Sequence, residues 1–121
     1  MEKREKSEIK SQSDAFVNIW NSRPDLRGRI FAINNNSENA IKGAFNKAMG
    51  VLPGVSDMAF VCEGGHIVWI EWKTSTGSQS KQQIEWQRQV TALGHTYIVV
   101  RSEDEFLQVI ARYESKRDVY A

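Results

Sequence analysis

Hydrophobic residues recur along the chain with two different periods, and the change of period predicts where helices and strands lie. From Ser7 to Pro24 the apolar residues follow helical spacing, and the proline ends that pattern. The apolar run at 29–34 is typical of a short strand. The turn and N-cap residues at 34–37 predict the start of a second helix. Its apolar pattern ends at Ala48, and Gly50 supplies the residue that closes the helix. The first part of the chain therefore predicts helix, strand and helix.

The rest of the chain predicts two further helices and three further strands. In chain order they are strands at 57–62 and 66–73 around the tight turn 63–65, a helix at 80–93, a strand at 97–101 and a helix at 102–113. Both helices begin with a capping box, Ser80 to Gln83 and Ser102 to Glu105. The order is α-β-α-β-β-α-β-α. Because a helix joins the last two strands, we expect a mixed sheet with helices on its faces.

Length and composition indicate one globular domain. The chain has 121 residues, of which 40% are hydrophobic and 26% charged. We expect a single domain over 1–121, with loose ends at 1–6 and 114–121. The net charge of +1 excludes a wholly basic nucleic-acid-binding surface, and the single cysteine excludes a disulfide framework or a cysteine zinc cluster.

The sequence also bears on location. No apolar run approaches the roughly 18 residues of a membrane span, and the charged start lacks the apolar core of a signal peptide. We therefore expect a soluble, cytoplasmic protein with no membrane partner.

Acidic residues in the central hairpin are the strongest candidates for chemistry. Hairpin pairing brings the start of the 57–62 strand beside the end of the 66–73 strand, so Asp57 and Glu71 converge. Lys73 lies two residues after Glu71, on the same face and about 6.8 Å along the strand. Two carboxylates suit Mg²⁺ or Mn²⁺, and a neighbouring lysine suits phosphodiester hydrolysis. The spacing alone also allows a solvated Glu71–Lys73 pair at the strand edge.

Several motifs share the spacing of one nuclease family. They are Gly-Val-x-x-Gly-Val-Ser-Asp at 50–57, Glu-x-Lys-Thr at 71–74, Gly-x-x-Ser-x-x-Gln-x-x-Trp at 77–86, Leu-Gly at 93–94 and Ser-Glu at 102–103. In this pattern the chain resembles the VRR-NUC (virus-type replication-repair nuclease) domain of the PD-(D/E)XK superfamily. The match extends more weakly to Glu8, Gln12 and Asn34. Ser56 departs from the proline that often precedes the first acid.

The resemblance implies a restriction-endonuclease-like α/β fold and a set of catalytic roles. Asp57 and Glu71 would hold Mg²⁺, for which Mn²⁺ substitutes, together with the backbone carbonyl of Trp72. Lys73 would position the attacking water. Gln83, at the start of the crossover helix, would face the site, and Glu8 would supply an additional acid.

Two of these residues have structural alternatives that the sequence leaves open. Gln83 is also the third residue of the helix that Ser80 caps, where its side chain bonds the backbone N–H of that serine. Glu8 lies in a charged helix start, where an acid favours the helix dipole in any case.

A basic segment is the candidate DNA contact. Between Trp20 and Gly50 the chain has five basic residues against two acidic ones, an excess of three. The candidate DNA-binding residues are Arg27, Arg29, Asn34, Asn35, Lys42 and Lys47. Such a patch would bind phosphates in a salt-dependent way. An ordinary turn followed by a charged helix face explains the same residues.

The combined prediction is a metal-dependent DNA endonuclease that acts on branched DNA, in the manner of a Holliday-junction resolvase. Two symmetric cuts call for a homodimer. The alternatives are a less selective duplex or flap nuclease of phage or plasmid replication and repair, and a non-catalytic DNA-binding module. A small-molecule enzyme is disfavoured because no phosphate loop, cofactor fingerprint or Ser/His/Asp set is present.

Overall fold

Four strands form one mixed sheet in the order β1-β2-β3-β4, in a computed structural model that describes residues 6–33 and 40–114. The strands are β1 (Ile30–Ala32), β2 (Met58–Cys62), β3 (His66–Trp72) and β4 (Thr96–Val100). β2 is antiparallel to both β1 and β3, and β4 is parallel to β3. The mixed sheet flanked by helices confirms the predicted fold class.

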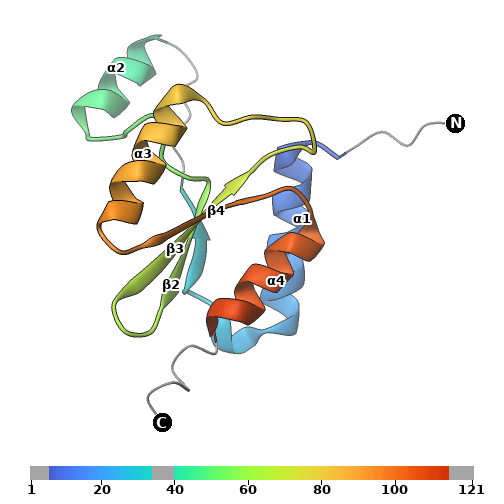
Figure 1. Ribbon diagram of the computed structural model, residues 1–121. Helices are drawn as coiled ribbons and strands as arrows, with labels where there is room; N and C mark the ends of the chain where they lie inside the picture. Colours follow the sequence, from blue (N-terminus) through green and yellow to red (C-terminus); the bar gives the residue numbers. More distant parts are fainter. Residues whose placement is uncertain (1–5, 34–39, 115–121) are drawn as a thin grey trace, which may run out of the picture.

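Helices cover both faces of this sheet. They are α1 (Glu8–Ser22), α2 (Ala40–Ala48), α3 (Lys81–Ala92) and α4 (Glu103–Glu114), with a 3₁₀ turn η1 (Pro24–Leu26) after α1. Figure 1 shows α1 and α4 on one side of the sheet and α3 on the other. The hydroxyls of Ser7, Ser80 and Ser102 accept backbone N–H bonds of the first turns of α1, α3 and α4. The predicted capping box is complete in α3. In α4 the side chain of Glu105 accepts the N–H of Arg101 in place of that of Ser102.

The boundaries differ from the prediction mainly around β1. This strand is three residues long, whereas the apolar run predicted six, and η1 was not predicted. Leu26 in η1 is buried, so tertiary packing holds a turn that local spacing does not reveal. The predicted helix start at 34–37 lies outside the described residues, as do 1–5 and 115–121.

The main hydrophobic core lies between the sheet and the α1–α4 pair. Alternate residues of β2 and β3 point into it, as period-2 patterning requires. Trp72 is 1% exposed and stacks on Phe106 of α4, with ring centroids 5.4 Å apart. The core residues are Ala15, Ile19, Leu26, Ile30, Met58, Phe60, Cys62, Val68, Ile70, Trp72, Val100, Phe106, Val109, Ile110 and Tyr113.

The opposite face of the sheet has a thinner, aromatic layer under α3. Trp86 of α3 packs edge-on against Trp69 and also contacts Tyr97, with centroid distances of 4.9 and 5.9 Å. These contacts hold α3 across β3 and β4, so the first turn of α3 lies at the carboxyl end of β3.

Helix α2 stands apart from both layers. None of its residues is buried: Ile41 and Phe45 are 85% and 63% exposed, and Met49, directly after the helix, is 69% exposed. In the described part of the chain, no helix combines the length and the apolar character needed to span a membrane.

Ion pairs hold the described ends of the chain. Lys6 bonds Asp14 and Glu103, which links the start of α1 to the start of α4. Arg23 pairs with Asp25 and with Glu114, the last residue of α4. Of the expected loose ends, 1–6 and 114–121, only Lys6 and Glu114 are described, and both make these contacts.

Candidate active site

Asp57 and Glu71 face each other across the β2–β3 pair. Met58 pairs with Ile70 in this antiparallel ladder, so the next positions outward are Asp57 and Glu71. Oδ2 of Asp57 accepts the backbone N–H of Trp72 at 2.7 Å. Because the N–H and C=O of an extended residue point to the same side, the carbonyl of Trp72 also faces Asp57.

The loop before Asp57 is fixed on both sides. Ser56 is fully buried, and its hydroxyl donates to the carbonyl of Met58 at 3.0 Å. Gly54 has a φ of +93°, and a Cβ there would come within 2.7 Å of the carbonyl oxygen of Gln82. A glycine is therefore required where this loop crosses the first turn of α3, and that crossing sets the position of Asp57.

Glu71 is a buried carboxyl group beside a second acid. It is 2% exposed, and its Oε1 has no hydrogen-bond partner among the described residues. Burial, followed by the charge of Asp57, raises the pKa of Glu71 to about 8. A buried acid with an unpartnered oxygen next to another acid is the arrangement that a bound cation relieves.

Lys73 places a cation beside this pair. Its Nζ lies 3.7 Å from Oε2 of Glu71, and its side chain is only 13% exposed. The backbone N–H of Lys73 donates to the carbonyl of Val100, which continues the parallel pairing beyond β3. This pairing holds the lysine on the same face as Glu71, as the strand alternation predicts.

Gln83 makes both of the contacts that the sequence left as alternatives. Its Oε1 accepts the backbone N–H of Ser80 at 2.8 Å, which completes the capping box of α3. Its Nε2 donates to Oε2 of Glu71 at 2.9 Å. The side-chain amide of Gln83 therefore caps the start of α3 and binds Glu71 at the same time.

Substitutions at Gln83 should separate these two contacts. Gln83→Ala removes both and should lower the free energy of unfolding by about 1 kcal/mol through loss of the capping box. Gln83→Glu keeps a capping acceptor and places a carboxylate against Glu71, so the helix should persist while the pKa of Glu71 rises further. Thermal unfolding and an NMR titration of the Glu71 carboxyl test this. Equal stability of the two variants would contradict it.

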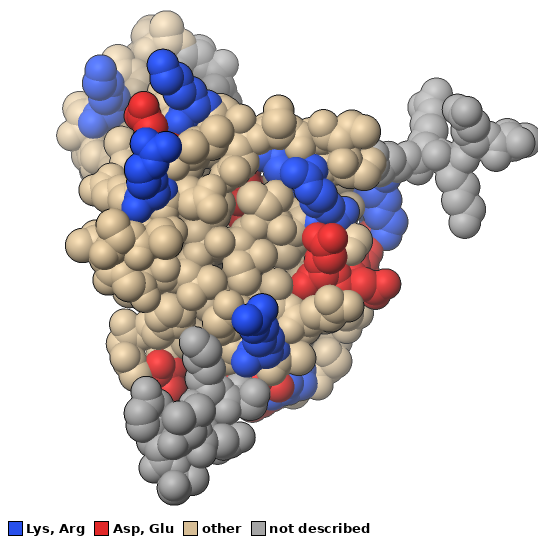
Figure 2. Space-filling model, viewed as in Figure 1, with Lys and Arg blue, Asp and Glu red and all other residues tan. Residues whose placement is uncertain are grey.

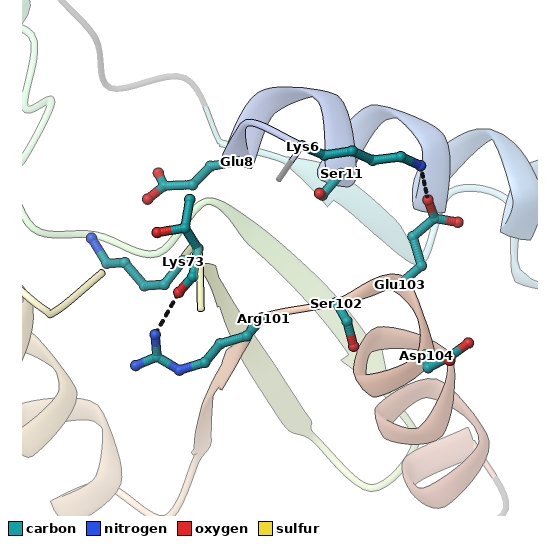
Figure 3. Close-up of a pocket in the computed structure, with 9 residues that line it drawn as sticks. Lys6, Glu8, Ser11, Lys73, Arg101, Ser102, Glu103 and Asp104 are labelled. Atoms are coloured by element: carbon teal, nitrogen blue, oxygen red, sulfur yellow. Dashed lines mark hydrogen bonds and ion pairs between the residues drawn. The ribbon is translucent and has the colours of Figure 1, made fainter. Parts of the chain in front are cut away.

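Glu8 approaches the site from the other side of the sheet end. It lines a cavity of about 350 Å³ together with Lys6, Ser11, Lys73, Thr74, Arg101, Ser102, Glu103 and Asp104. Figure 3 shows Glu8 at the start of α1, across the opening from Lys73 and Arg101. Its charge also raises the pKa of Glu71, although less than burial and Asp57 do.

The residues present fit a hard divalent cation. Among the described residues, 6–33 and 40–114, no group of three Asp, Glu, His or Cys side chains is close enough together to hold a metal ion. Magnesium needs no such group, since it is commonly held by one or two carboxylates and keeps several waters. Asp57, Glu71 and the carbonyl of Trp72 match that pattern of oxygen donors.

The sequence did not single out a polar group beneath α3. Gln79 donates to Gln87 at 2.9 Å and lies 3.4 Å from the hydroxyl of Tyr97. Burial, followed by the charge of Glu71, raises the pKa of Tyr97 to about 12. Tyr97 sits in an apolar, β-branched run, and only the pairing of β3 with β4 brings it near Glu71.

The structure separates the predicted DNA-binding residues into two groups. Arg29 donates to the carbonyl of Val61, and Arg27 lies over the ring of Trp20, so both are at the opposite end of β2 from Asp57. Lys42 and Lys47 are on α2. Figure 2 shows basic side chains over α2 and α3, with a largely uncharged surface below them. Asn34 and Asn35 lie outside the described residues.

The comparisons with known proteins bear on the fold. No protein-family model matches the sequence, and a search of the curated proteins finds no match. A search of solved structures finds a chain described as "VRR_NUC domain protein", with a TM-score of 0.72 and 20% identity over 91% of this chain and 89% of that one. The chain has the fold of a VRR-NUC domain. Within this VRR-NUC fold, Asp57, Glu71 and Lys73 meet at one end of the sheet, where the sequence resemblance placed them.

Proposed function

We propose that the protein is a metal-dependent DNA endonuclease. The observation that carries the proposal is the pair Asp57 and Glu71 on a VRR-NUC fold. Oε1 of Glu71 has no partner among the described residues, and Oε2 lies 3.7 Å from Nζ of Lys73. These groups supply oxygen ligands for a cation and a positive charge for a phosphate.

In this reaction one P–O bond forms to a water oxygen, which loses a proton to solvent, and one P–O bond to a deoxyribose oxygen breaks, with that oxygen taking up a proton from solvent. Bound Mg²⁺ would supply charge stabilisation and a more acidic water. Asp57, Glu71 and the Trp72 carbonyl would hold it. Lys73 would donate a hydrogen bond to the attacking water or to a phosphate oxygen. Its ion pair with Glu71 holds the side-chain ammonium group at the site. Gln83 would keep Glu71 oriented, and Glu8 would add negative charge at the far side of the opening.

We propose branched DNA as the substrate and a two-fold dimer as the active form. Two copies related by a two-fold axis would present two equivalent sites, which paired cuts in a four-way junction require. The exposed apolar side chains of Ile41 and Phe45 on α2, and of Met49 directly after it, support this, because exposed apolar patches mark association surfaces. Lys42 and Lys47 on the same helix would then lie near the DNA.

Cleavage of a labelled four-way junction, beside linear duplex and flap DNA of equal length, tests the proposal. The protein is assayed with Mg²⁺, Mn²⁺ or EDTA, and its mass in solution is measured by light scattering. We expect a dimer that makes metal-dependent, paired cuts in the junction.

Other outcomes would redirect the proposal. Equal cutting of all three DNAs would retain the nuclease and reject selectivity for junctions. Salt-sensitive DNA binding without cleavage in either metal would overturn the enzyme and favour a binding module.

A further inference from the structure

Arg101 connects three elements at the mouth of the candidate site. It follows β4 directly, and its backbone N–H donates at 2.7 Å to Oε2 of Glu105, whose own backbone N–H donates to the hydroxyl of Ser102 in the first turn of α4. Its side chain lines the same cavity as Lys73 and Glu8. In Figure 3, the side chains of Arg101 and Lys73 project to the same side of the sheet end.

The guanidinium of Arg101 closes the turn that follows Lys73. Its Nη1 donates to the carbonyls of Thr74 and Gly77 at 2.6 and 2.7 Å. The N–H of Gly77 donates back to the carbonyl of Thr74, so residues 74–77 form a turn whose first and last carbonyls share one donor. Hydrogen bonds from a charged donor are stronger than neutral ones, so this turn is firmly tied to β4.

The position of this turn affects both ends of the candidate site. A Cβ at Gly77 would lie 3.1 Å from Oγ1 of Thr74 and 3.7 Å from Oε1 of Glu8, so the turn packs beside that acid. Lys73 precedes the turn. After it the chain leads to Ser80 and then to Gln83, which reaches Glu71. Movement of the turn would therefore shift Lys73, Glu8 and Gln83 relative to one another.

We propose that Arg101 is a positioning residue, which fixes the 74–77 turn and thereby sets Lys73 and Gln83 against Glu71. The expected effect on DNA cleavage rests on the proposed nuclease function. The expected effect on the order of the 74–77 turn does not. The proposal predicts an effect on the rate of the chemical step, because the groups that Arg101 aligns act after DNA is bound.

The test compares Arg101→Ala and Arg101→Lys with wild type in cleavage kinetics and in amide hydrogen exchange over 74–80. We expect Arg101→Ala to lower kcat by about 10- to 100-fold with KM nearly unchanged, and to speed exchange in the turn. Arg101→Lys should restore part of both, since an ammonium can donate to the same two carbonyls. Arg112→Ala is the control, because Arg112 lies in the last turn of the same helix that Arg101 precedes and contacts the ring of Tyr113.

Each result decides the question. A rise in KM with unchanged kcat and unchanged exchange would make Arg101 a phosphate contact and overturn the proposal. Unchanged kinetics and exchange would also overturn it. If circular dichroism shows that Arg101→Ala does not fold, Arg101→Lys carries the same comparison. If wild type cleaves no DNA with any metal, the nuclease function fails, and the exchange measurement still decides whether Arg101 holds the turn.

Discussion

Replacing Asp57 with asparagine is expected to abolish DNA cleavage while leaving the fold intact. Asparagine retains an oxygen that can accept the backbone N–H of Trp72, which Oδ2 of Asp57 accepts in the structure. It removes one of the two charges that would hold the cation. We expect cleavage to fall by at least about 100-fold, since even groups that only support metal ligands contribute 10- to 100-fold.

The measurement is cleavage of the preferred DNA under saturating Mg²⁺, with thermal unfolding recorded in metal-free buffer. Asp25→Asn is the matched control, because Asp25 is an exposed partner of Arg23 and not part of the site. In metal-free buffer, Asp57→Asn should be no less stable than wild type, since it removes repulsion against Glu71. Undiminished cleavage by the variant would place the metal site elsewhere and contradict the proposed function.

Replacing Glu71 with glutamine is expected to stabilise the metal-free protein at high pH and to inactivate it. Burial raises the pKa of Glu71 in the folded protein to about 8, above its ordinary value of 4.5. A raised pKa means that stability is fully present below pH 4.5 and declines as the pH rises towards 8. Over that window the free energy of unfolding should fall by on the order of 1 kcal/mol per pH unit. Glutamine has no such charge, so this decline should disappear in Glu71→Gln.

Denaturant unfolding in EDTA at several pH values between 4.5 and 8 provides the measurement, with cleavage assayed in parallel. Glu85→Gln serves as the control, because Glu85 lies on the exposed side of α3. Added Mg²⁺ should stabilise wild type at pH 8 more than at pH 5 and should have little effect on Glu71→Gln. A wild-type stability that does not change with pH would show that Glu71 is not held in an unfavourable ionised state.

Local patterning was sufficient to predict most of the secondary structure. The helix starts at Ser7, Ser80 and Ser102 depend on side chains that bond their own first turn, so nearby residues determine them. The pairing of β2 with β3 depends on a short hairpin, and this local connection was enough to bring Asp57 opposite Glu71. Because α3 joins β3 to β4, the sequence also predicted that β4 could pair with β3 in parallel.

The tertiary structure decided the features that depend on distant parts of the chain. Arg101 contacts the 74–77 turn, and Tyr97 contacts Gln79. Both contacts depend on the parallel pairing of β3 with β4. The raised pKa of Glu71 requires burial under α3, which the glutamate itself does not encode.

The basic segment shows the same division between local and distant effects. The sequence shows the excess of positive charge between Trp20 and Gly50, but it does not predict where these basic side chains lie in the folded protein. Arg27 and Arg29 lie between η1 and β1, where they bond the carbonyls of Trp20 and Val61, whereas Lys42 and Lys47 lie on α2. Helix caps and hairpins follow from contacts within a few residues. The environment of a charged group follows from the whole fold, because long-range packing sets its burial and its neighbours.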